Sequence, residues 1–433
     1  MPLTRILRLG LRQFAAGMLS VLTLGILNRV MKVDFGLNLT LVSVVIGIHY
    51  FAAVVAIPFG HRSDRRPWRG YHRTPYIVLG TILTALSTAL APFVAFLLAN
   101  QRGSLPAVAV GVALFLLMGV GMYVAGTAYL SLITDLTVEE ERGKVVAITW
   151  AMMMVGILVG VFVSIRLMEH YTPQGLVLLF LVMAGLLVGL TALAIWGQEQ
   201  RGPARLSQDA LTLKQAVRLL TISQQTRFFF AFLFAGIFFQ FMQQMALEPF
   251  GGDVFGLSLK ETTLFNAYQM VGVLLGMALS GAWLARRFGK KATTGLGSAV
   301  TGIAFALLVL ASLGGYLPLV RPGIFVTGLG MGMFTVGGLS LMMDLTVKEQ
   351  VGLFMGAWTL AQALANGLAS VGGGILHDAG LALFASEAGA YALVFGVEAV
   401  GSLAIIALLI QVDVGRFRTE VGELSWHVFG DAG

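Results

Sequence analysis

The sequence predicts an all-α membrane protein in which twelve transmembrane helices form two pseudo-symmetric six-helix halves. The first observation behind this prediction is the composition, because 57% of the 433 residues are hydrophobic and only 11% are charged. Soluble domains carry about 25% charged residues, so most of this chain cannot face water. The other two observations are the spacing of long apolar stretches and an internal repeat. The chain has no cysteine, which excludes disulfides and cysteine-ligated metals.

Apolar stretches long enough to span a membrane, which takes about 20 residues, recur along the chain. Ten such stretches lack Asp, Glu, Lys and Arg: 35–61, 75–101, 103–134, 145–165, 171–198, 228–247, 262–285, 292–320, 322–343 and 350–377. Two more, 13–28 and 388–412, are shorter or interrupted by Glu398, which brings the predicted number of spans to twelve. We interpret 13–28 as a retained helix, because no small-residue cleavage site follows it.

The distribution of basic residues predicts the orientation of the chain. The N-terminus, the gaps after even-numbered spans and the C-terminal tail together hold 22 of the 28 Lys and Arg residues. Positive charge accumulates on the cytoplasmic side of membrane proteins, so both termini are expected in the cytoplasm. Basic cytoplasmic loops that face anionic lipid also account for the net charge of +7. We therefore do not expect nucleic acid as a partner.

The two halves of the chain are related in sequence. Phe35-Gly36-Leu37 returns as Phe255-Gly256-Leu257, and Asp135-Leu136-Thr137-Val138 returns as Asp344-Leu345-Thr346-Val347. Six spans separate the copies, so the halves share one orientation, which is typical of the major facilitator fold. The predicted parts are a first six-helix half (1–197), a cytoplasmic linker (198–227), a second six-helix half (228–411) and a cytoplasmic tail (412–433).

The loop after span 2 is a candidate cytoplasmic latch. It places Asp64 among several arginines, and a positive-inside loop explains the arginines but not the acid. An acid here can lie against a helix N-terminus, while Arg65 can pair with Asp135 at the end of span 4. In the second half, Arg286 can pair with Asp344 in the same way.

Span 7 combines aromatic side chains with amides. It contains eight phenylalanines, and Gln240, Gln244 and Glu248 follow at four-residue intervals with Gln243 beside them. Polar groups in hydrocarbon are costly and point to function, so these three glutamines and His49 of span 2 are candidate ligand donors. Aromatic stripes usually contact lipid, and an interhelical hydrogen bond explains each polar residue taken singly.

Several signals of other functions are absent from the sequence. Spans 1, 4, 5 and 10 carry no mid-membrane acid or base, which a proton-driven exporter needs, and Glu398 lies in the last span. The chain has no phosphate-binding loop, metal triad or nucleophile–base pair, so we expect neither an enzyme nor a metal site. An interior of Phe, Met, Gly and a few amides favours a large apolar ligand over a sugar or an ion.

Several longer motifs occur in the two halves: Leu27-Asn28-Arg29-Val30-Met31 with Asp34, Arg62-Ser63-Asp64, Thr74-Pro75-Tyr76-Ile77, Glu248-Pro249-Phe250-Gly251-Gly252, Val254-Phe255-Gly256-Leu257-Ser258 and Glu261-Thr262-Thr263. With these motifs the chain resembles the PucC/LhaA family, the bacteriochlorophyll-delivery branch of the major facilitator superfamily, and the resemblance covers residues 1 to about 420. The chain departs from the family at Gln244, where the family pattern has an acid. An amide oxygen there would have to replace a carboxylate as a magnesium ligand.

The resemblance implies a protein that handles chlorophyll or bacteriochlorophyll, with magnesium present only inside the chlorin. Its expected partners are the lipid bilayer, antenna or photosystem polypeptides and pigment-synthesis enzymes, in an inner, intracytoplasmic or thylakoid membrane. Two alternatives stay open, a secondary transporter of a small amphipathic solute and a structural subunit of a photosynthetic complex. Asn28, Arg29 and Glu248 are expected to form a clamp on the outer side, where Arg29 ends span 1 and Glu248 ends span 7.

Overall fold

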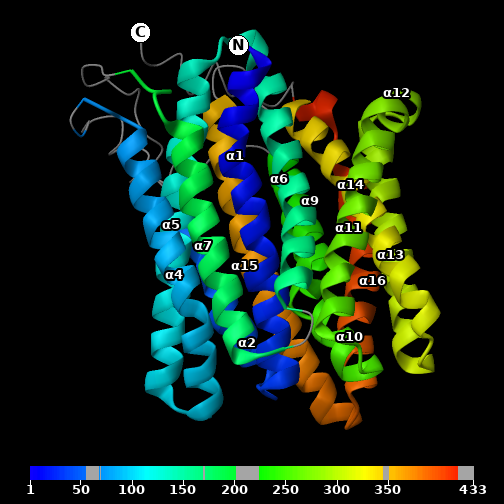
Figure 1. The fold of residues 1–433 in the computed structure, drawn as a ribbon. Helices are drawn as coiled ribbons and strands as arrows, with labels where there is room; N and C mark the ends of the chain where they lie inside the picture. The colour runs from blue at the N-terminus through cyan, green and yellow to red at the C-terminus, as the bar shows by residue number, and fades with distance from the viewer. Residues whose placement is uncertain (55–67, 69, 169–170, 201–223, 345–350, 418–433) are drawn as a thin grey trace. The chain divides into compact units, whose positions relative to one another are not determined.

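The computed structural model describes residues 1–54, 68, 70–168, 171–200, 224–344 and 351–417. Every regular element in these ranges is a helix (Figure 1). Eleven of the described helical stretches are long and apolar enough to cross a membrane, and Leu39–Ala52 is a shorter apolar helix inside the predicted second span. The protein is therefore an integral membrane protein, as predicted.

The described helices divide into two compact units. The first comprises Met1–Ala210, Gln244–Met270 and Ser370–Ala390, and the second comprises the remaining segments. Helices α11 (Leu259–Leu279), α15 (Val351–Phe384) and α16 (Glu387–Gln411) contribute to both units. The grouping differs from a division at the middle of the chain, because parts of the second half belong to the first unit. The predicted linker, 198–227, lies mostly outside the described residues.

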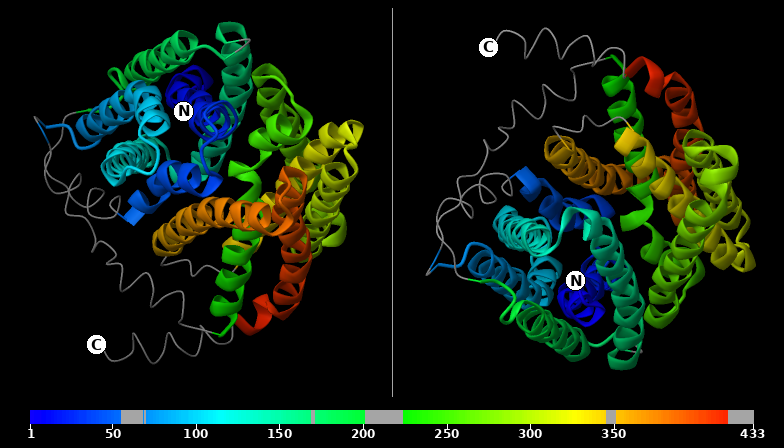
Figure 2. Two further views of the ribbon diagram at one scale, coloured as in Figure 1. Left: turned by 90° about the horizontal axis from the view of Figure 1, so that it is seen from below. Right: turned by 90° about the horizontal axis from the view of Figure 1, so that it is seen from above.

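The first unit contains most of the first sequence half. Its helices are α1 (Leu3–Ser20), α2 (Leu39–Gly47), α4 (Thr74–Asn100), α5 (Leu105–Leu136), α6 (Glu139–Leu167), α7 (Pro173–Ile195) and α10 (Leu247–Phe255), with π-helical turns at Val21–Leu27 and Val30–Asp34 and a 3₁₀ turn at Ile48–Ala52. Helix α1 packs against α6 and α7, and α4 packs against α5 and α7 (Figure 2). Small residues permit the close crossings, since Gly80 and Gly121 bring the backbones of α4 and α5 together.

The second unit is built on a pair of long helices. Its remaining helices are α9 (Gln224–Phe241), α12 (Ala285–Phe288), α13 (Lys290–Gly314) and α14 (Leu317–Asp344). Helices α13 and α14 pack closely, with Gly297 and Gly330 at their contact. The phenylalanines of α9 form part of a buried cluster in which the rings of Phe229 and Trp358 stack at 6.2 Å. Part of the Phe-rich stripe therefore packs inside the protein.

The first span is longer than predicted. It runs from Leu3 to Asp34, whereas the apolar stretch covers 13–28. Arg12 lies inside this helix because its guanidinium stacks over the ring of Tyr129 at 5.0 Å. The hydroxyl of Tyr129 in turn donates to the carbonyl of Leu9 at 2.8 Å. A charge that ends an apolar stretch in the sequence is thus accommodated by a neighbouring helix.

Candidate functional site

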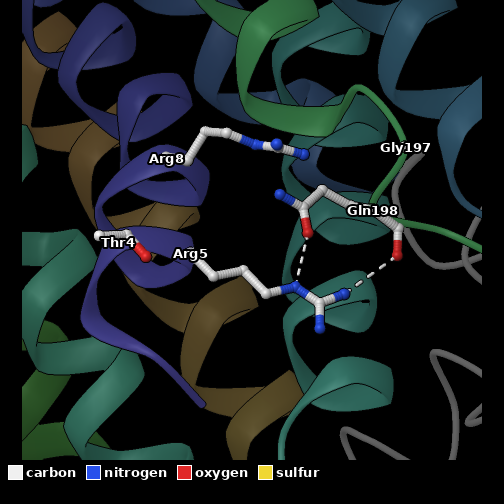
Figure 3. A pocket seen from close by; sticks show the side chains of 5 residues that line it. All are labelled: Thr4, Arg5, Arg8, Gly197 and Gln198. Atoms are coloured by element: carbon white, nitrogen blue, oxygen red, sulfur yellow. Dashed lines mark hydrogen bonds between the residues drawn. The ribbon is translucent and has the colours of Figure 1, made fainter.

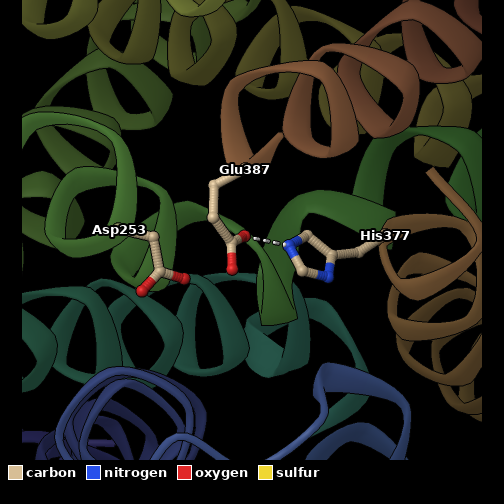
Figure 4. A group of neighbouring side chains, drawn as sticks. All are labelled: Asp253, His377 and Glu387. Carbon is tan, nitrogen blue, oxygen red and sulfur yellow. Dashed lines mark hydrogen bonds and ion pairs between the residues drawn. The ribbon is translucent and has the colours of Figure 1, made fainter. Parts of the chain in front are cut away.

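Charged side chains of the first unit gather around Lys32. Its ammonium lies 2.9 Å from Oε1 of Glu387 and 3.3 Å from Oδ2 of Asp253. The second oxygen of Glu387 lies 2.9 Å from Nε2 of His377 (Figure 4). These residues come from the end of span 1, from α10, from α15 and from the start of α16. The network therefore ties together segments that lie far apart in the sequence.

The network continues to the start of α2. Asp378 accepts hydrogen bonds from the backbone N–H groups of Leu39 (3.2 Å) and Thr40 (2.8 Å), and it lies 3.0 Å from Nδ1 of His377. The N-cap residue Asn38 makes no side-chain capping bond, so Asp378 supplies the cap from another helix. A carboxylate at a helix N-terminus is also favoured by the helix dipole.

Three side chains of the network have the chemistry of metal ligands. One ligand atom each of Asp253, His377 and Glu387 lie within 4.8 Å of one another. The ammonium of Lys32 already lies beside two of these three groups, the carboxylates of Asp253 and Glu387. In this arrangement the carboxylates are balanced by an ammonium, and the group is an ion-pair network in the first unit.

The expected outer clamp is only partly formed. Arg29 pairs with Asp34 at 2.5 Å and donates to the carbonyl of Leu257 at 3.1 Å, whereas Glu248 accepts from the amide of Asn266. Asn28 donates to the carbonyl of Met245 at 2.8 Å. The prediction of a direct Arg29–Glu248 ion pair is therefore wrong, because the π-helical turn after Arg29 brings Asp34 within reach of the guanidinium.

Glu248 is buried against span 1. A Cβ atom built on Gly25 would overlap its carboxylate, so a larger residue at this position would have to displace the Glu248 side chain. Among the described residues, Glu248 Oε2, Arg29 Nε and Asn28 Oδ1 are buried without a hydrogen-bond partner. Glu248 follows the span that ends at Met245, and burial raises the pKa of its carboxyl to about 8, although Asn266 and Arg29 oppose the shift. At neutral pH this carboxyl is mostly protonated.

The raised pKa of Glu248 predicts a pH dependence of stability. Between the ordinary value of 4.5 and the folded value of about 8, the folded protein keeps a proton that the unfolded chain releases. Stability should therefore fall as pH rises through this window. Glu248→Gln cannot titrate, and we expect its melting temperature in detergent to fall less than that of the wild type between pH 5 and pH 8. Equal falls in both proteins would contradict this assignment.

The amides of span 7 do not share one continuous helical face. Helix α9 ends at Phe241, and a 3₁₀ turn over Met242–Met245 precedes α10. The expected four-residue stripe is thus wrong, because the turn changes the register between Gln240 and Gln244. The turn also redirects the backbone N–H of Gln243, which donates to Oε1 of Glu398 at 2.5 Å.

The three glutamines differ in their partners. Gln244 accepts a hydrogen bond from the hydroxyl of Tyr50 at 3.0 Å in the first unit. Gln240 and Gln243 belong to the second unit and are buried, and there Gln240 Nε2 and Gln243 Oε1 have no hydrogen-bond partner among the described residues. Of the three glutamines, Gln243 therefore has a buried side-chain oxygen that is not engaged.

His49 has a defined tautomer in the structure. Its Nδ1 lies 2.6 Å from the carbonyl oxygen of Ile46, and a carbonyl can only accept, so Nδ1 carries the proton. In a neutral ring Nε2 then has the free lone pair. The residue is 4% exposed, and its ring lies against that of Tyr50 in a tilted arrangement with the centroids 4.0 Å apart. His49 thus has the arrangement of a ligating histidine whose other nitrogen is held by the backbone.

The predicted latch is only partly described. Asp64 and Arg65 lie outside the described residues. Asp135 bonds Nε of Arg73 at 3.1 Å, and Asp344 bonds the ammonium of Lys290 at 2.8 Å. The prediction of an Arg286–Asp344 ion pair is wrong. Lys290, the first residue of α13, lies beside the end of α14 and takes Asp344 as its partner, whereas Arg286 is exposed.

No sequence pattern predicts the residues of the Lys32 network. Lys32 is one of the six Lys and Arg residues outside the predicted cytoplasmic segments, and His377 and Asp378 stand where the charge-free stretch 350–377 ends. Neither Asp253 nor Glu387 belongs to a sequence pattern that predicts a site. One hint of the network is that Lys32 and Asp253 both lie close to motifs that resemble the family.

Solved structures show which fold this is. A D-xylose-proton symporter matches with a TM-score of 0.72 at 15% identity, over 94% of this chain and 98% of that one. A nucleoside transporter matches with a TM-score of 0.69 at 15% identity, over 94% and 99% of the two chains. The protein thus has the major facilitator fold, as predicted, and this fold is that of membrane transporters or facilitators.

Sequence relatives identify the family. "Protein PucC" of Rhodobacter capsulatus is 33% identical, over 94% of this chain and 92% of its own length. "Bacteriochlorophyll synthase 44.5 kDa chain" of the same species is 32% identical, over 96% of both chains. The model of the PUCC protein family matches residues 26–417. The chain therefore belongs to the PUCC protein family, as its motifs predicted.

Proposed function

We propose that the protein binds chlorophyll or bacteriochlorophyll as cargo and delivers it during assembly of light-harvesting or photosystem complexes. Membership of the PUCC family supports this proposal, as does a relative of nearly equal length that is named for bacteriochlorophyll synthesis. Antenna or photosystem polypeptides would receive the pigment, and pigment-synthesis enzymes would supply it. In this proposal the chain lies in a photosynthetic or inner membrane with both termini in the cytoplasm.

The observation that carries the proposal is the tautomer of His49. A chlorin is a broad apolar plate whose central magnesium takes an axial nitrogen or oxygen ligand. His49 offers the lone pair of Nε2, while Ile46 holds Nδ1 at 2.6 Å and so fixes the direction of the ring. In the second unit, Gln243 Oε1 is a separate buried oxygen without a partner among the described residues, on the segment that follows the Phe-rich helix α9.

His49 lies on a closely packed and mainly apolar segment of the first unit. The 3₁₀ turn Ile48–Ala52 packs on α5, where a Cβ on Gly119 would overlap the carbonyl of His49. This close approach fixes the backbone that carries the imidazole. Cargo binding needs apolar walls and few polar groups that set the orientation, and the helices of this unit carry mainly aliphatic and aromatic side chains.

The proposal predicts that His49 controls the amount of bound pigment. His49→Leu removes the nitrogen ligand at similar volume, and we expect bound pigment per protein to fall at least about tenfold, since losing even a hydrogen-bond partner of a metal ligand typically costs about 10- to 100-fold in affinity. His49→Gln keeps an oxygen donor and should retain more pigment than His49→Leu. The measurement is the absorption spectrum of protein purified in mild detergent from a phototrophic membrane, with the melting temperature as a check on folding.

Two results would contradict the pigment proposal. The first is a wild-type protein that carries no pigment when it is isolated from such a membrane. The second is full pigment retention by His49→Leu, Gln240→Leu, Gln243→Leu and Gln244→Leu alike. If vesicles containing the pigment-free protein instead take up a small amphipathic solute, the protein is a secondary transporter. Copurification at fixed stoichiometry with a mature photosynthetic complex would instead identify a structural subunit.

A further inference from the structure

A cavity of about 370 Å³, wide open to the surface, lies where the start of α1 meets the end of α7, at the end of the first unit that carries the N-terminus. It is lined by Thr4, Arg5, Arg8, Gly197 and Gln198 (Figure 3). Both arginines project from the same side of α1 toward the turn that follows α7, because they are three residues apart on a helix. The volume is in the range of small-ligand sites, about 300–1,000 Å³.

The arginines are held in place by the turn after α7. Nε of Arg5 donates to the side-chain oxygen of Gln198 at 2.7 Å, and its terminal nitrogen donates to the Gln198 carbonyl at 3.3 Å. Arg8 donates to the carbonyl of Trp196. Gly197 makes this turn possible, because its φ of 61° is a left-handed conformation that glycine adopts readily. Each guanidinium has five N–H donors, so both retain donors that these bonds do not use.

The cavity carries positive charge from its arginines. Among the described residues, the five that line it include no carboxylate. Two acids of the same region have other partners. Glu199 accepts from the backbone N–H groups of His72, Arg73 and Thr74, and Glu141 pairs with the amino group of Met1. The two guanidinium groups and the hydroxyl of Thr4 are the groups that an anion with several oxygens would bind.

We propose that this cavity binds a phosphate group, supplied by an anionic lipid headgroup or by a soluble phosphate. Guanidinium forks match the oxygens of phosphate, and basic pockets at helix ends recognise lipid headgroups. Two exposed apolar residues are sequence neighbours of residues that line the cavity: Leu7 precedes Arg8, and Trp196 precedes Gly197. Trp196 is 78% exposed, as is typical of tryptophan at a membrane interface. These side chains favour the lipid as the source of the phosphate.

The test measures lipid binding to the full chain in detergent by native mass spectrometry. Dioleoylphosphatidylglycerol, dioleoylphosphatidylcholine and inorganic phosphate are titrated separately. We expect the anionic lipid to bind more tightly than the zwitterionic lipid, and Arg8→Gln to weaken its binding about tenfold, which corresponds to about 1.4 kcal/mol. Arg8→Lys keeps the charge without the fork and should give an intermediate loss. Arg287→Gln is the matched control, since it removes one exposed arginine of α12, outside the cavity.

Each outcome decides the proposal. A selective loss in Arg8→Gln, with unchanged melting temperature, supports a phosphate site. Binding of inorganic phosphate that Arg8→Gln weakens, without preference for the anionic lipid, supports the same site with a soluble phosphate as its source. Equal losses in Arg8→Gln and Arg287→Gln would show a general effect of surface charge and overturn the proposal. Unchanged binding in Arg8→Gln overturns it as well.

Discussion

Lys32→Met is expected to destabilise the protein by about 3 kcal/mol, since removing one partner of a buried ion pair costs about 3–5 kcal/mol. The substitution keeps the length of the side chain but removes the ammonium that lies beside both Asp253 and Glu387. We place the loss at the lower end because the Glu387 side chain is 32% exposed. The melting temperature and the yield of folded protein in detergent measure the effect.

Two further variants test whether the loss of stability is specific to the Lys32 network. Lys144→Met removes an exposed lysine of α6 and should leave the melting temperature almost unchanged, since exposed pairs contribute little. Lys32→Met combined with Glu387→Gln removes one of the unbalanced charges and should recover part of the stability. If the double variant is as unstable as the sum of the two single variants, Lys32 and Glu387 are not coupled.

Gly156→Ala is the second substitution with a large expected effect. A Cβ on Gly156 would overlap the carbonyl oxygen of Phe14 on α1, and neither backbone can move without separating α1 from α6. Overpacking costs about 1–3 kcal/mol, and backbone-to-backbone contact predicts a loss of about 3 kcal/mol. The change is measured as a fall in melting temperature and in the fraction of monodisperse protein after purification.

The matched control for Gly156 lies on α7. Gly189 is also helical, but a Cβ there would meet no atom within 4 Å. Gly189→Ala should therefore leave stability unchanged or raise it slightly, because alanine favours the helix more than glycine does. Equal destabilisation by both substitutions would mean that the α1–α6 crossing is looser than the structure shows.

The predictions from sequence succeeded where the relevant property is local along the chain. The length of each apolar stretch predicted the spans, and the repeat of Phe35-Gly36-Leu37 predicted the fold that the solved structures share. The motif Glu248-Pro249-Phe250-Gly251-Gly252 resembled the family whose model matches residues 26–417. These signals depend on residue type and order, and no knowledge of contacts between helices is needed to read them.

The predicted contacts were less successful, and Arg29 shows why. The sequence placed it at the same side as Glu248 but could not show that the helix takes a π-helical turn, which brings Asp34 to 2.5 Å. The amide stripe failed for a similar reason, because the 3₁₀ turn at Met242–Met245 shifts the register. Local departures from α-helical geometry alter which side chains meet, and hydrophobic periodicity does not reveal them.

By itself, the sequence determined that this is a helical membrane protein of two related halves and that it resembles the family to which it belongs. Only the tertiary structure decided that Lys32 joins Asp253 and Glu387, that Asp378 caps α2, and that His49 keeps the lone pair of Nε2 free. Partition into a membrane depends on the summed apolar character of about 20 consecutive residues. The partner of a buried charge depends instead on helix packing, which can bring two residues within about 4 Å of each other whatever their separation along the chain.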